Sequence, residues 1–218
     1  MMSRATCDLS LYLIIGPGDT SGRAIVDVVL AAVRGGVTVV QLRRKDDAAG
    51  AFVDEARALV QVLRPLGIPL IVNDRVDVAL AADADGVHVG QRDMTVADVR
   101  RIGGEGILVG LSVTNMDEAG AVPAYGVDYV GVGPVFATAS KPDAAAPLGV
   151  DGTRAVCAAL SVPCVAIGGV GTGNIDDVLS TGVAGVAVIS AICAAASPRA
   201  AAVELSERIA QRRVATWR

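Results

Sequence analysis

The sequence predicts a single (β/α)8 barrel, and three observations lead to that fold class. Short apolar runs alternate with amphipathic helical patterns eight times along the 218 residues. Strands that alternate with helices favour right-handed crossovers and a parallel sheet. No linker and no shift in composition interrupts the series, so we expect one domain over residues 1–218, with short tails at 1–10 and 213–218. Eight units in a chain of this length indicate closure into a barrel rather than an open sheet.

Each expected strand is a short apolar run, as strands buried on both faces of a parallel sheet usually are. In chain order the strands are expected within residues 11–15, 37–45, 69–74, 86–90, 108–113, 129–135, 163–169 and 185–190. Apolar residues at helical spacing predict helices over 25–33, 48–63 and 95–102, in a segment that ends near 82, and from 115, 151, 174 and 198 onward. Asp19 or Thr20 is the expected cap of the first helix. The longest connection, residues 136–150, contains two prolines and is typical of a functional loop.

Composition excludes several classes of function. The net charge is −4 and aromatic residues make up 3% of the chain, which argues against a general nucleic-acid surface. The first ten residues lack the apolar core of a signal peptide, and no apolar run approaches the length of a membrane span. We therefore expect a cytoplasmic protein without a membrane partner. The four cysteines show no C-x-x-C spacing and are expected to be reduced thiols.

The scarcity of histidine and lysine narrows the chemistry further. His88 is the only histidine, which excludes a multi-histidine metal site. It lies in phase with Gly86 and Gly90, so its side chain is expected inside the barrel, where a hydrogen-bonded structural role is favoured over a catalytic one. Lys45 and Lys141 are the only lysines, beside 17 arginines. Since an ammonium and a guanidinium are not interchangeable at a tight anion site, both positions need a reason.

Polar residues gather at the carboxyl ends of the strands, where the chemistry of such barrels is found. The strand starts, by contrast, carry almost nothing ionisable. In the second strand, alternation places Gln41, Arg43 and Lys45 on one side, which either aims an amide and two cations at an anion or forms a solvated strand end. The other strand ends contribute Asn73, Asp74, Gln91, Asp93, Ser112, Thr138, Ser140, Lys141, Gly168, Gly169, Ile189 and Ser190.

Two anion sites follow from these residues. Asp74 and Asp93, at neighbouring strand ends and facing cations, suit Mg²⁺ held with waters and substrate phosphate, and this site suits a diphosphate. Asp74 could instead cap the next helix, whereas Thr95 is an adequate cap that leaves Asp93 without that role. The second site is the glycine-rich backbone after the seventh and eighth strands, including Gly185, which either permits tight turns or forms a nest for a monophosphate. Two phosphorylated substrates and one departing diphosphate are typical of a transferase.

The chain resembles the thiamine phosphate synthase family through nine motifs between residues 11 and 192. In order they are LYLI, QLRRK, PLIVNDR, DGVHVGQRD, VGLSVTN, DYVGVGPVFATASKPDA, PLG, AIGGV and GVAVISAI. The resemblance implies a (β/α)8 barrel that joins hydroxymethylpyrimidine diphosphate to hydroxyethylthiazole phosphate, or to its carboxylated form, and releases diphosphate. It also implies a dissociative displacement, assisted by Mg²⁺, in which the thiazole nitrogen attacks without a strong base.

Matched position by position, the resemblance implies three groups of site residues. The pyrimidine diphosphate site would comprise Gln41, Leu42, Arg43, Arg44, Lys45, Asn73, Ser112 and Lys141, with Arg43, Lys45, Ser112 and Lys141 acting in catalysis. The Mg²⁺ ligands would be Asp74 and Asp93. The thiazole phosphate site would comprise Thr138, Ser140, Gly169, Ile189 and Ser190.

Two positions depart from the family's usual pattern. Ser140 stands where the family usually has threonine. Serine keeps the hydroxyl and loses a methyl group, so we expect binding to persist with slightly looser packing. Gly16 and Pro17 stand where members often carry a polar pair, at a place not expected to contact substrate.

Two other functions stay open at this point. A thiazole tautomerase of the same superfamily resembles the synthase but transfers protons, and the retained diphosphate-handling set argues against it. A non-catalytic sensor of a phosphorylated vitamin precursor is the second alternative, which the paired carboxylates disfavour. The expected partners are small-molecule substrates rather than nucleic acid or membrane, and a homodimer is compatible with the sequence.

Overall fold

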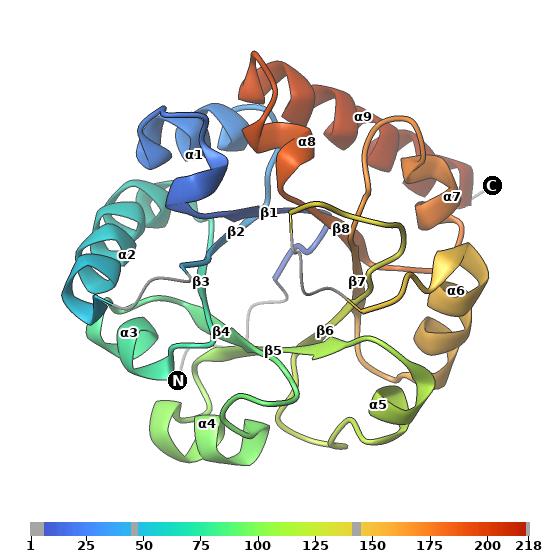
Figure 1. The fold of residues 1–218 in the computed structure, drawn as a ribbon, viewed down its shortest axis with the longest axis horizontal. Helices are drawn as coiled ribbons and strands as arrows, with labels where there is room; N and C mark the ends of the chain where they lie inside the picture. The colour runs from blue at the N-terminus through green and yellow to red at the C-terminus, as the bar shows by residue number, and fades with distance from the viewer. Residues whose placement is uncertain (1–6, 45–47, 141–144, 217–218) are drawn as a thin grey trace.

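The computed structural model describes residues 7–44, 48–140 and 145–216, and for 213–216 it describes the backbone alone. Eight parallel strands close into a barrel in chain order, and the last strand pairs back to the first (Figure 1). Helices surround the barrel on the outside. The predicted (β/α)8 fold is therefore confirmed.

The strands follow the apolar runs of the sequence, and several are shorter than predicted. They are β1 (Leu11–Ile15), β2 (Val39–Leu42), β3 (Leu70–Asn73), β4 (Gly86–Val89), β5 (Leu108–Val113), β6 (Tyr129–Val132), β7 (Cys164–Ile167) and β8 (Gly185–Val188). The helices are α1 (Ile25–Val33), α2 (Ala49–Leu63), α3 (Val76–Ala81), α4 (Val96–Gly103), α5 (Met116–Gly120), α6 (Gly149–Ala159), α7 (Ile175–Leu179), α8 (Ser190–Cys193) and α9 (Pro198–Thr216). Two short 3₁₀ turns, η1 (Pro17–Asp19) and η2 (Arg64–Leu66), complete the described elements.

The starts of the helices agree with the predicted caps at α4 but not at α1. Thr95 accepts a hydrogen bond from a backbone N–H in the first turn of α4, and Asn115 does the same for α5. The predicted cap at Asp19 or Thr20 is wrong, because η1 occupies this part of the chain and α1 begins only at Ile25.

Alternation along the strands divides the apolar side chains into two layers. In β1, Leu11, Leu13 and Ile15 face outward and pack against the helices in the larger core. Tyr12 and Ile14 face into the barrel. Buried residues from other strands that complete this inner layer are Val39, Ile71, Tyr129, Val165 and Ala187. Because the strands are buried on both faces, their sequences are continuous apolar runs rather than alternating ones.

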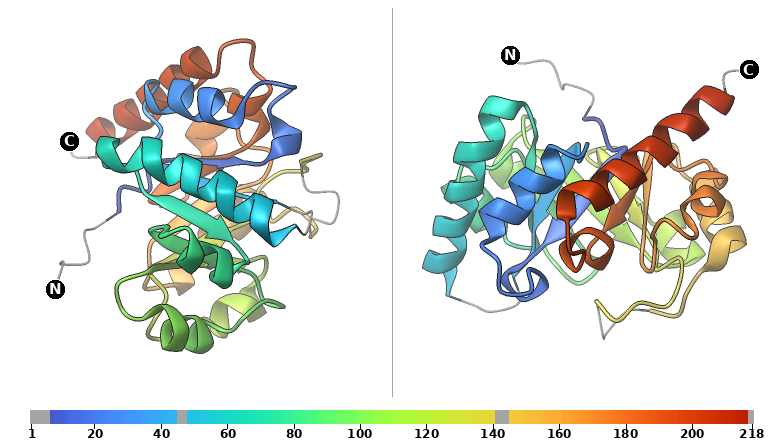
Figure 2. Two further views of the ribbon diagram at one scale, coloured as in Figure 1. Left: turned by 90° about the vertical axis from the view of Figure 1, so that its left-hand side faces the viewer. Right: turned by 90° about the horizontal axis from the view of Figure 1, so that it is seen from above.

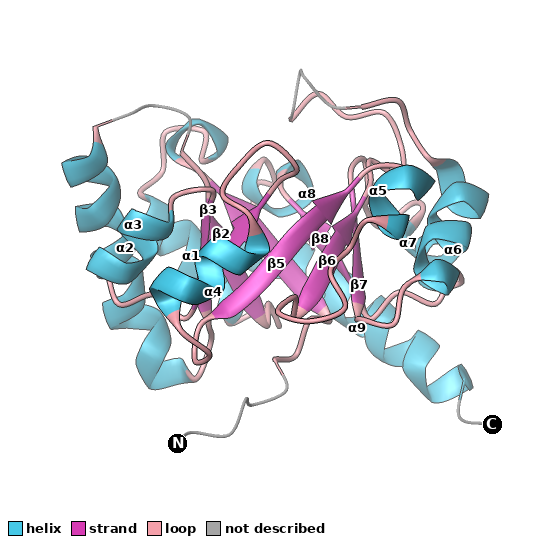
Figure 3. Ribbon diagram, turned by 90° about the horizontal axis from the view of Figure 1, so that it is seen from below, coloured by secondary structure: helices cyan, strands magenta, loops and turns pink. Residues whose placement is uncertain are grey.

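The structure describes residues 7–10 and 213–216 of the two predicted tails. Residues 213–216 belong to α9, which continues to Thr216 and runs along the outside of the barrel against α1 (Figure 2). At the other terminus, Leu9 packs in the inner layer, and the Ser10 carbonyl oxygen accepts a hydrogen bond from the Val186 N–H. Figure 3 shows this segment at the end of the barrel that holds the strand starts. None of the helices in the described ranges has both the length and the apolar character needed to cross a bilayer.

The strand starts carry more charge than the sequence indicated. Asp85 and Asp128 stand directly before β4 and β6 and accept hydrogen bonds from the backbone N–H groups of Leu70 (2.9 Å) and Val109 (2.7 Å). Asp128 also forms an ion pair with Arg100. These carboxylates link neighbouring strands, so the prediction of almost no ionisable groups at this end was wrong.

Candidate active site

A cavity of about 410 Å³ is lined by residues at the carboxyl ends of the strands. Its wall includes the predicted residues Gln41, Arg43, Asn73, Ser112, Thr138, Ser140, Gly168, Gly169, Ile189 and Ser190. The structure thus brings together residues from six strand ends and the loops that follow them. Gln41 and Ser190, the two that are farthest apart in the sequence, are separated by 149 positions. Lys45 and Lys141 lie outside the described residues, and their roles stay predictions.

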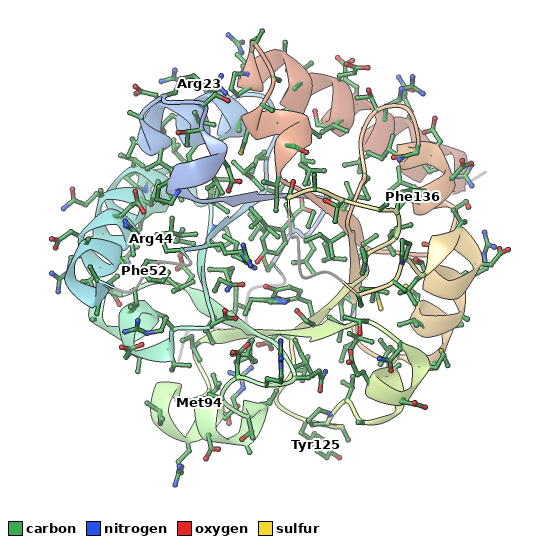
Figure 4. The ribbon with its side chains drawn as sticks, viewed as in Figure 1. Arg23, Arg44, Phe52, Met94, Tyr125 and Phe136 are labelled. Carbon is green, nitrogen blue, oxygen red and sulfur yellow. The ribbon has the colours of Figure 1, made fainter. Side chains whose placement is uncertain are left out.

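The end of β2 sends alternate side chains to opposite sides of the strand. Gln41 and Arg43 line the cavity. Leu42 is fully buried in the outer core, and the Arg44 guanidinium lies 3.2 Å from the Glu55 carboxylate of α2. In Figure 4, Arg44 lies over α2 near Phe52, away from the centre of the barrel. Two of the side chains predicted to bind the pyrimidine substrate, Leu42 and Arg44, therefore do not face the cavity.

Gly16 allows the loop after β1 to approach the end of β2. A Cβ atom at this position would lie 2.2 Å from the Arg43 carbonyl oxygen, so a side chain there would displace the backbone. The Asp19 carboxylate holds the same turn by accepting a hydrogen bond from the Gly16 N–H (2.8 Å). Gly16, which stands where family members often carry a polar residue, therefore has a packing role beside Arg43.

Asp74 and Asp93 are not among the residues of the cavity wall, but they interact with each other, and Asp74 also interacts with Arg43 and Asn73, which belong to the wall. Asp74 has a left-handed backbone (φ 61°) and does not cap α3, which lacks a side-chain cap. Partial burial raises the pKa of Asp74 to about 6, and the Asp93 carboxylate contributes to the increase, whereas the Arg43 guanidinium opposes it. Asp93 accepts a hydrogen bond from the Gly90 N–H (2.7 Å). The described residues contain no group of three or more His, Cys, Asp and Glu side chains that could hold a metal, so this pair would need ligands from substrate or water.

The loop after β7 is built from backbone that only glycine adopts readily. Gly168 and Gly169 have φ values of 98° and 66°, and a Cβ atom on Gly169 would lie 2.8 Å from the Ala137 carbonyl oxygen. The Asn174 side chain stabilises this loop with two hydrogen bonds of 2.9 Å: its Nδ2 donates to the Gly169 carbonyl oxygen, and its Oδ1 accepts from the Gly171 N–H. Asn174 also lines the cavity, and the sequence analysis missed it.

The short helix α8 completes this side of the cavity with Ser190 at its start. Arg23, labelled in Figure 4, donates hydrogen bonds to the carbonyl oxygens of Cys193 and Ala195 and so ties α8 to the start of α1. Gly185 has a different role from the one considered in the sequence analysis. It lies at the start of β8, where a Cβ atom would lie 1.8 Å from the Leu9 carbonyl oxygen, so it permits close packing at the opposite end of the barrel.

The floor of the cavity is a row of hydrogen-bonded side chains. The Gln41 amide nitrogen donates to the Tyr12 hydroxyl (2.9 Å), which lies 2.7 Å from the Tyr129 hydroxyl. His88 lies between Tyr129 and Ser112, with Nδ1 3.1 Å from the tyrosine hydroxyl and Nε2 2.9 Å from the serine hydroxyl. The predicted position of His88 inside the barrel is confirmed. The two tyrosines were missed; their phase on β1 and β6 could have placed them inside the barrel, but not in contact with each other.

This chain is similar in sequence to known proteins over most of its length. The sequence model of the family described as thiamine monophosphate synthase matches residues 11–192. A thiamine-phosphate synthase of Xanthobacter autotrophicus is 52% identical over 202 residues, which are 93% of this chain and 96% of that protein. A second one, of Chloroflexus aurantiacus, is 51% identical over 198 residues, 91% of each protein.

A solved structure agrees with the same assignment. Thiamine phosphate pyrophosphorylase from Pyrococcus furiosus superposes with a TM-score of 0.85 at 35% sequence identity, and the match covers 94% of this chain and 98% of that one. The region matched by the family model contains all eight strands and each described part of the cavity wall. The chain belongs to the thiamine monophosphate synthase family.

Proposed function

We propose that the chain joins hydroxymethylpyrimidine diphosphate to hydroxyethylthiazole phosphate, or to its carboxylated form, and so forms thiamine phosphate and diphosphate. The observation that carries this proposal is a single cavity whose wall holds both predicted sets of residues. Arg43 and Asn73 belong to the expected diphosphate side, and Gly169 and Ser190 belong to the expected monophosphate side. Relatives about 50% identical over more than nine-tenths of the chain are named for this synthesis.

The reaction requires the protein to hold two substrates in line and to stabilise charge on the leaving diphosphate. The aminopyrimidine ring releases electron density to the carbon that bears the diphosphate, so the carbon–oxygen bond breaks ahead of attack by the thiazole nitrogen. That nitrogen attacks with a neutral lone pair, and no strong base is needed. Arg43 is positioned to stabilise the leaving group, and Lys45 and Lys141 are proposed to act beside it.

We assign Asp74 and Asp93 as the protein ligands of Mg²⁺. The pair fits the ion, because the two neighbouring carboxylates offer hard oxygen ligands, and the proximity of Asp93 raises the pKa of Asp74, as a local excess of negative charge does. When bound there, Mg²⁺ would neutralise charge on the departing diphosphate. Substrate phosphate and water would provide the other ligands.

Retention of the cationic and acidic groups supports the synthase over the two alternatives. A thiazole tautomerase would not need Arg43, Asp74 and Asp93 together, since it handles no diphosphate. A sensor would not need charge stabilisation for a leaving group.

The four cysteines are free thiols, which supports the prediction of a cytoplasmic protein. A homodimer stays a prediction.

The proposed function is tested by measuring diphosphate release with both substrates and Mg²⁺, and with each of the three omitted in turn. We expect release only in the complete mixture, with one thiamine phosphate formed per diphosphate. Diphosphate release without the thiazole substrate at the full rate would contradict the transfer reaction. Binding of both substrates without turnover would favour the sensor.

Gly169→Val is expected to raise the KM for the thiazole substrate by more than about tenfold, while the KM for the pyrimidine substrate changes little. The reason is that valine disfavours the left-handed backbone of Gly169 and overlaps the Ala137 carbonyl oxygen, so the monophosphate side of the cavity is distorted. Gly173→Ala is the matched control, because Gly173 lies in the same loop with no atom near its would-be Cβ and lies outside the cavity wall. Steady-state kinetics that show a loss of pyrimidine affinity instead would overturn the proposed division of the cavity.

Asp74→Asn is expected to raise Tm at pH 8 in the absence of Mg²⁺. The folded-state pKa of Asp74, about 6, lies above its ordinary value, so ionisation lowers the free energy of unfolding as the pH rises from about 4 through 6. Asparagine cannot ionise and tolerates the left-handed backbone. Because the side chain is only partly buried and water screens its charge, we expect a gain of about 1 kcal/mol at most, or about 2–4 °C in Tm.

The Asp74→Asn gain should diminish as the pH falls from 6 toward 4, and saturating Mg²⁺ should stabilise the original protein but not the variant. Asp77→Asn is the control of opposite sign, because hydrogen bonding to Arg75 lowers the pKa of Asp77. Differential scanning calorimetry at several pH values measures both effects. A variant that is less stable than the original at pH 8 without Mg²⁺ would show that ionisation of Asp74 does not destabilise the folded chain.

A further inference from the structure

The hydrogen-bonded row on the cavity floor has a direction that its first member sets. The Gln41 amide nitrogen can only donate, so the Tyr12 oxygen accepts from it and the single hydroxyl hydrogen of Tyr12 points to Tyr129. The hydrogen of Tyr129 is then left for Nδ1 of His88. Each step follows because a tyrosine hydroxyl has one hydrogen to donate and both tyrosines are buried, so each hydrogen must be directed to the next acceptor of the row.

The same direction determines the state of His88. A ring whose Nδ1 accepts a hydrogen bond carries its proton on Nε2 when neutral, and Nε2 lies 2.9 Å from the Ser112 hydroxyl oxygen. The Ser112 oxygen therefore accepts from His88. Its own hydrogen is free to point elsewhere, and the serine side chain lines the cavity. Burial raises the pKa values of Tyr12 and Tyr129 above their usual range, so both hydroxyls keep their hydrogens at neutral pH.

Two glycines in neighbouring strands make room for this row. A Cβ atom on Gly110 of β5 would lie 2.3 Å from both Nδ1 of His88 and Cζ of Tyr129. One on Gly131 of β6 would lie 3.1 Å from Cε1 of His88. Since the rings of His88 and Tyr129 occupy the volume above these glycines, they are held against one another, and their ring centroids are 5.5 Å apart.

We propose that Tyr12, Tyr129 and His88 are positioning residues that hold Ser112 as a hydrogen-bond donor toward an acceptor atom of the pyrimidine substrate. The row keeps His88 as the neutral Nε2–H tautomer, and this tautomer turns the Ser112 hydrogen into the cavity. The carbonyl oxygen of Gln41, at the other end of the row, is left as an acceptor. The cavity thus offers the substrate one hydrogen-bond donor, the Ser112 hydroxyl, and one acceptor, the Gln41 carbonyl oxygen. This last step rests on the proposed function, whereas the direction of the row does not.

The direction of the row is tested on the protein without substrate. His88 is the only histidine, so a long-range ¹H–¹⁵N correlation spectrum of the ¹⁵N-labelled chain, after removal of any histidine tag, reports on this ring alone. We expect the protonated nitrogen to be Nε2, identified by its couplings to both carbon-bound ring protons. A proton on Nδ1, an even mixture of tautomers, or a doubly protonated ring would overturn the assigned direction.

Tyr12→Phe tests whether polarity is transmitted along the row. No hydrogen bond joins Tyr12 directly to His88, but loss of its hydroxyl removes the 2.7 Å contact that holds the Tyr129 oxygen as an acceptor. The Gln41 amide, which also interacts with Tyr129, replaces that contact only in part, so we expect the two ¹⁵N shifts of His88 to move toward each other. Thr181→Val is the matched control, because it removes a buried hydroxyl that donates to the Val178 carbonyl oxygen and takes no part in the row. An unchanged His88 spectrum in Tyr12→Phe, with the fold intact, would overturn transmission.

Kinetics then test whether the row acts through Ser112. We expect Tyr12→Phe to raise the KM for the pyrimidine substrate by about two- to tenfold at nearly unchanged kcat, the size of one neutral hydrogen bond. In a Ser112→Ala background, the same change should have no further effect. An equal loss of affinity in both backgrounds would show that Tyr12 acts by packing alone. If the chain had no synthase activity, the spectrum of His88 would still report the direction of the row, so the two failures are distinguishable.

Discussion

Arg43→Ala is expected to lower kcat by about a hundred- to a thousandfold, whereas Arg44→Ala should leave kcat within about twofold of the original value. The two arginines are adjacent in the sequence, but strand alternation places Arg43 in the cavity wall and Arg44 against Glu55 of α2. Negative charge grows on the diphosphate as its bond to carbon breaks. Removal of one preorganised donor from such a group costs about 2.7–4 kcal/mol in the transition state.

Arg43→Lys should restore part of the loss, because an ammonium keeps the charge but lacks the planar pair of donors. Arg44→Ala should lower Tm instead, since it leaves the Glu55 carboxylate without its partner at a site where both side chains are only 19% exposed. Steady-state kinetics at saturating Mg²⁺ and thermal unfolding separate the two effects. Equal losses of kcat in Arg43→Ala and Arg44→Ala would mean that both arginines contribute to catalysis, although strand alternation places them on opposite sides of the chain.

The two arginines also show which kind of sequence argument places a side chain correctly. The family motif assigned the run from Gln41 to Lys45 to one substrate, whereas strand alternation separated Gln41 and Arg43 from their neighbours. The structure agrees with the alternation, because Leu42 is in the outer core and Arg44 pairs with a helix. A motif identifies a segment near a substrate, but the two-residue period of a strand decides which side chains face it.

The barrel itself was predictable because its signals are local. The apolar runs, the helical spacing and the cap at Thr95 each depend on residues that are close in sequence. The cavity floor was not predictable in this way. The contact between Tyr12 and Tyr129 joins positions 117 residues apart and depends on the register of β1 and β6 within a closed barrel. Interpreted singly, each tyrosine is only one more apolar residue of a buried strand.

The missed helix cap near Asp19 has a similar cause. A short polar residue before an apolar pattern favours a cap, but the close approach of Gly16 to the Arg43 carbonyl oxygen requires a tight turn at the same place. Asp19 serves that turn by accepting from the Gly16 N–H, and the helix starts later, at Ile25. The tertiary contact between two strand ends thus overrides the local propensity of the sequence.

Asp93→Asn is expected to lower kcat by about a hundred- to a thousandfold and to move half-saturation to higher Mg²⁺ concentrations. Asparagine at this position keeps an oxygen that can accept the hydrogen bond from the Gly90 N–H, so the loop after β4 should hold its shape. The change therefore removes a charge without removing a structural contact. If Asp93 and Asp74 hold Mg²⁺ against the diphosphate, loss of one anionic ligand forfeits several kcal/mol of charge stabilisation in the transition state.

Asp98→Asn is the matched control for Asp93→Asn, because Asp98 is a carboxylate on the neighbouring helix α4 whose partners are Thr95 and Arg101 at the surface. It should affect Tm slightly and kcat not at all. Measurements of kcat across a Mg²⁺ titration, with circular dichroism to verify the fold, decide the matter. Full activity of Asp93→Asn at low Mg²⁺, or full activity of the original chain in excess chelator, would remove Asp93 from the metal site. A loss of kcat that no concentration of Mg²⁺ reverses, together with unchanged binding of both substrates, would place the effect of Asp93 in the transition state, where charge on the leaving diphosphate is greatest.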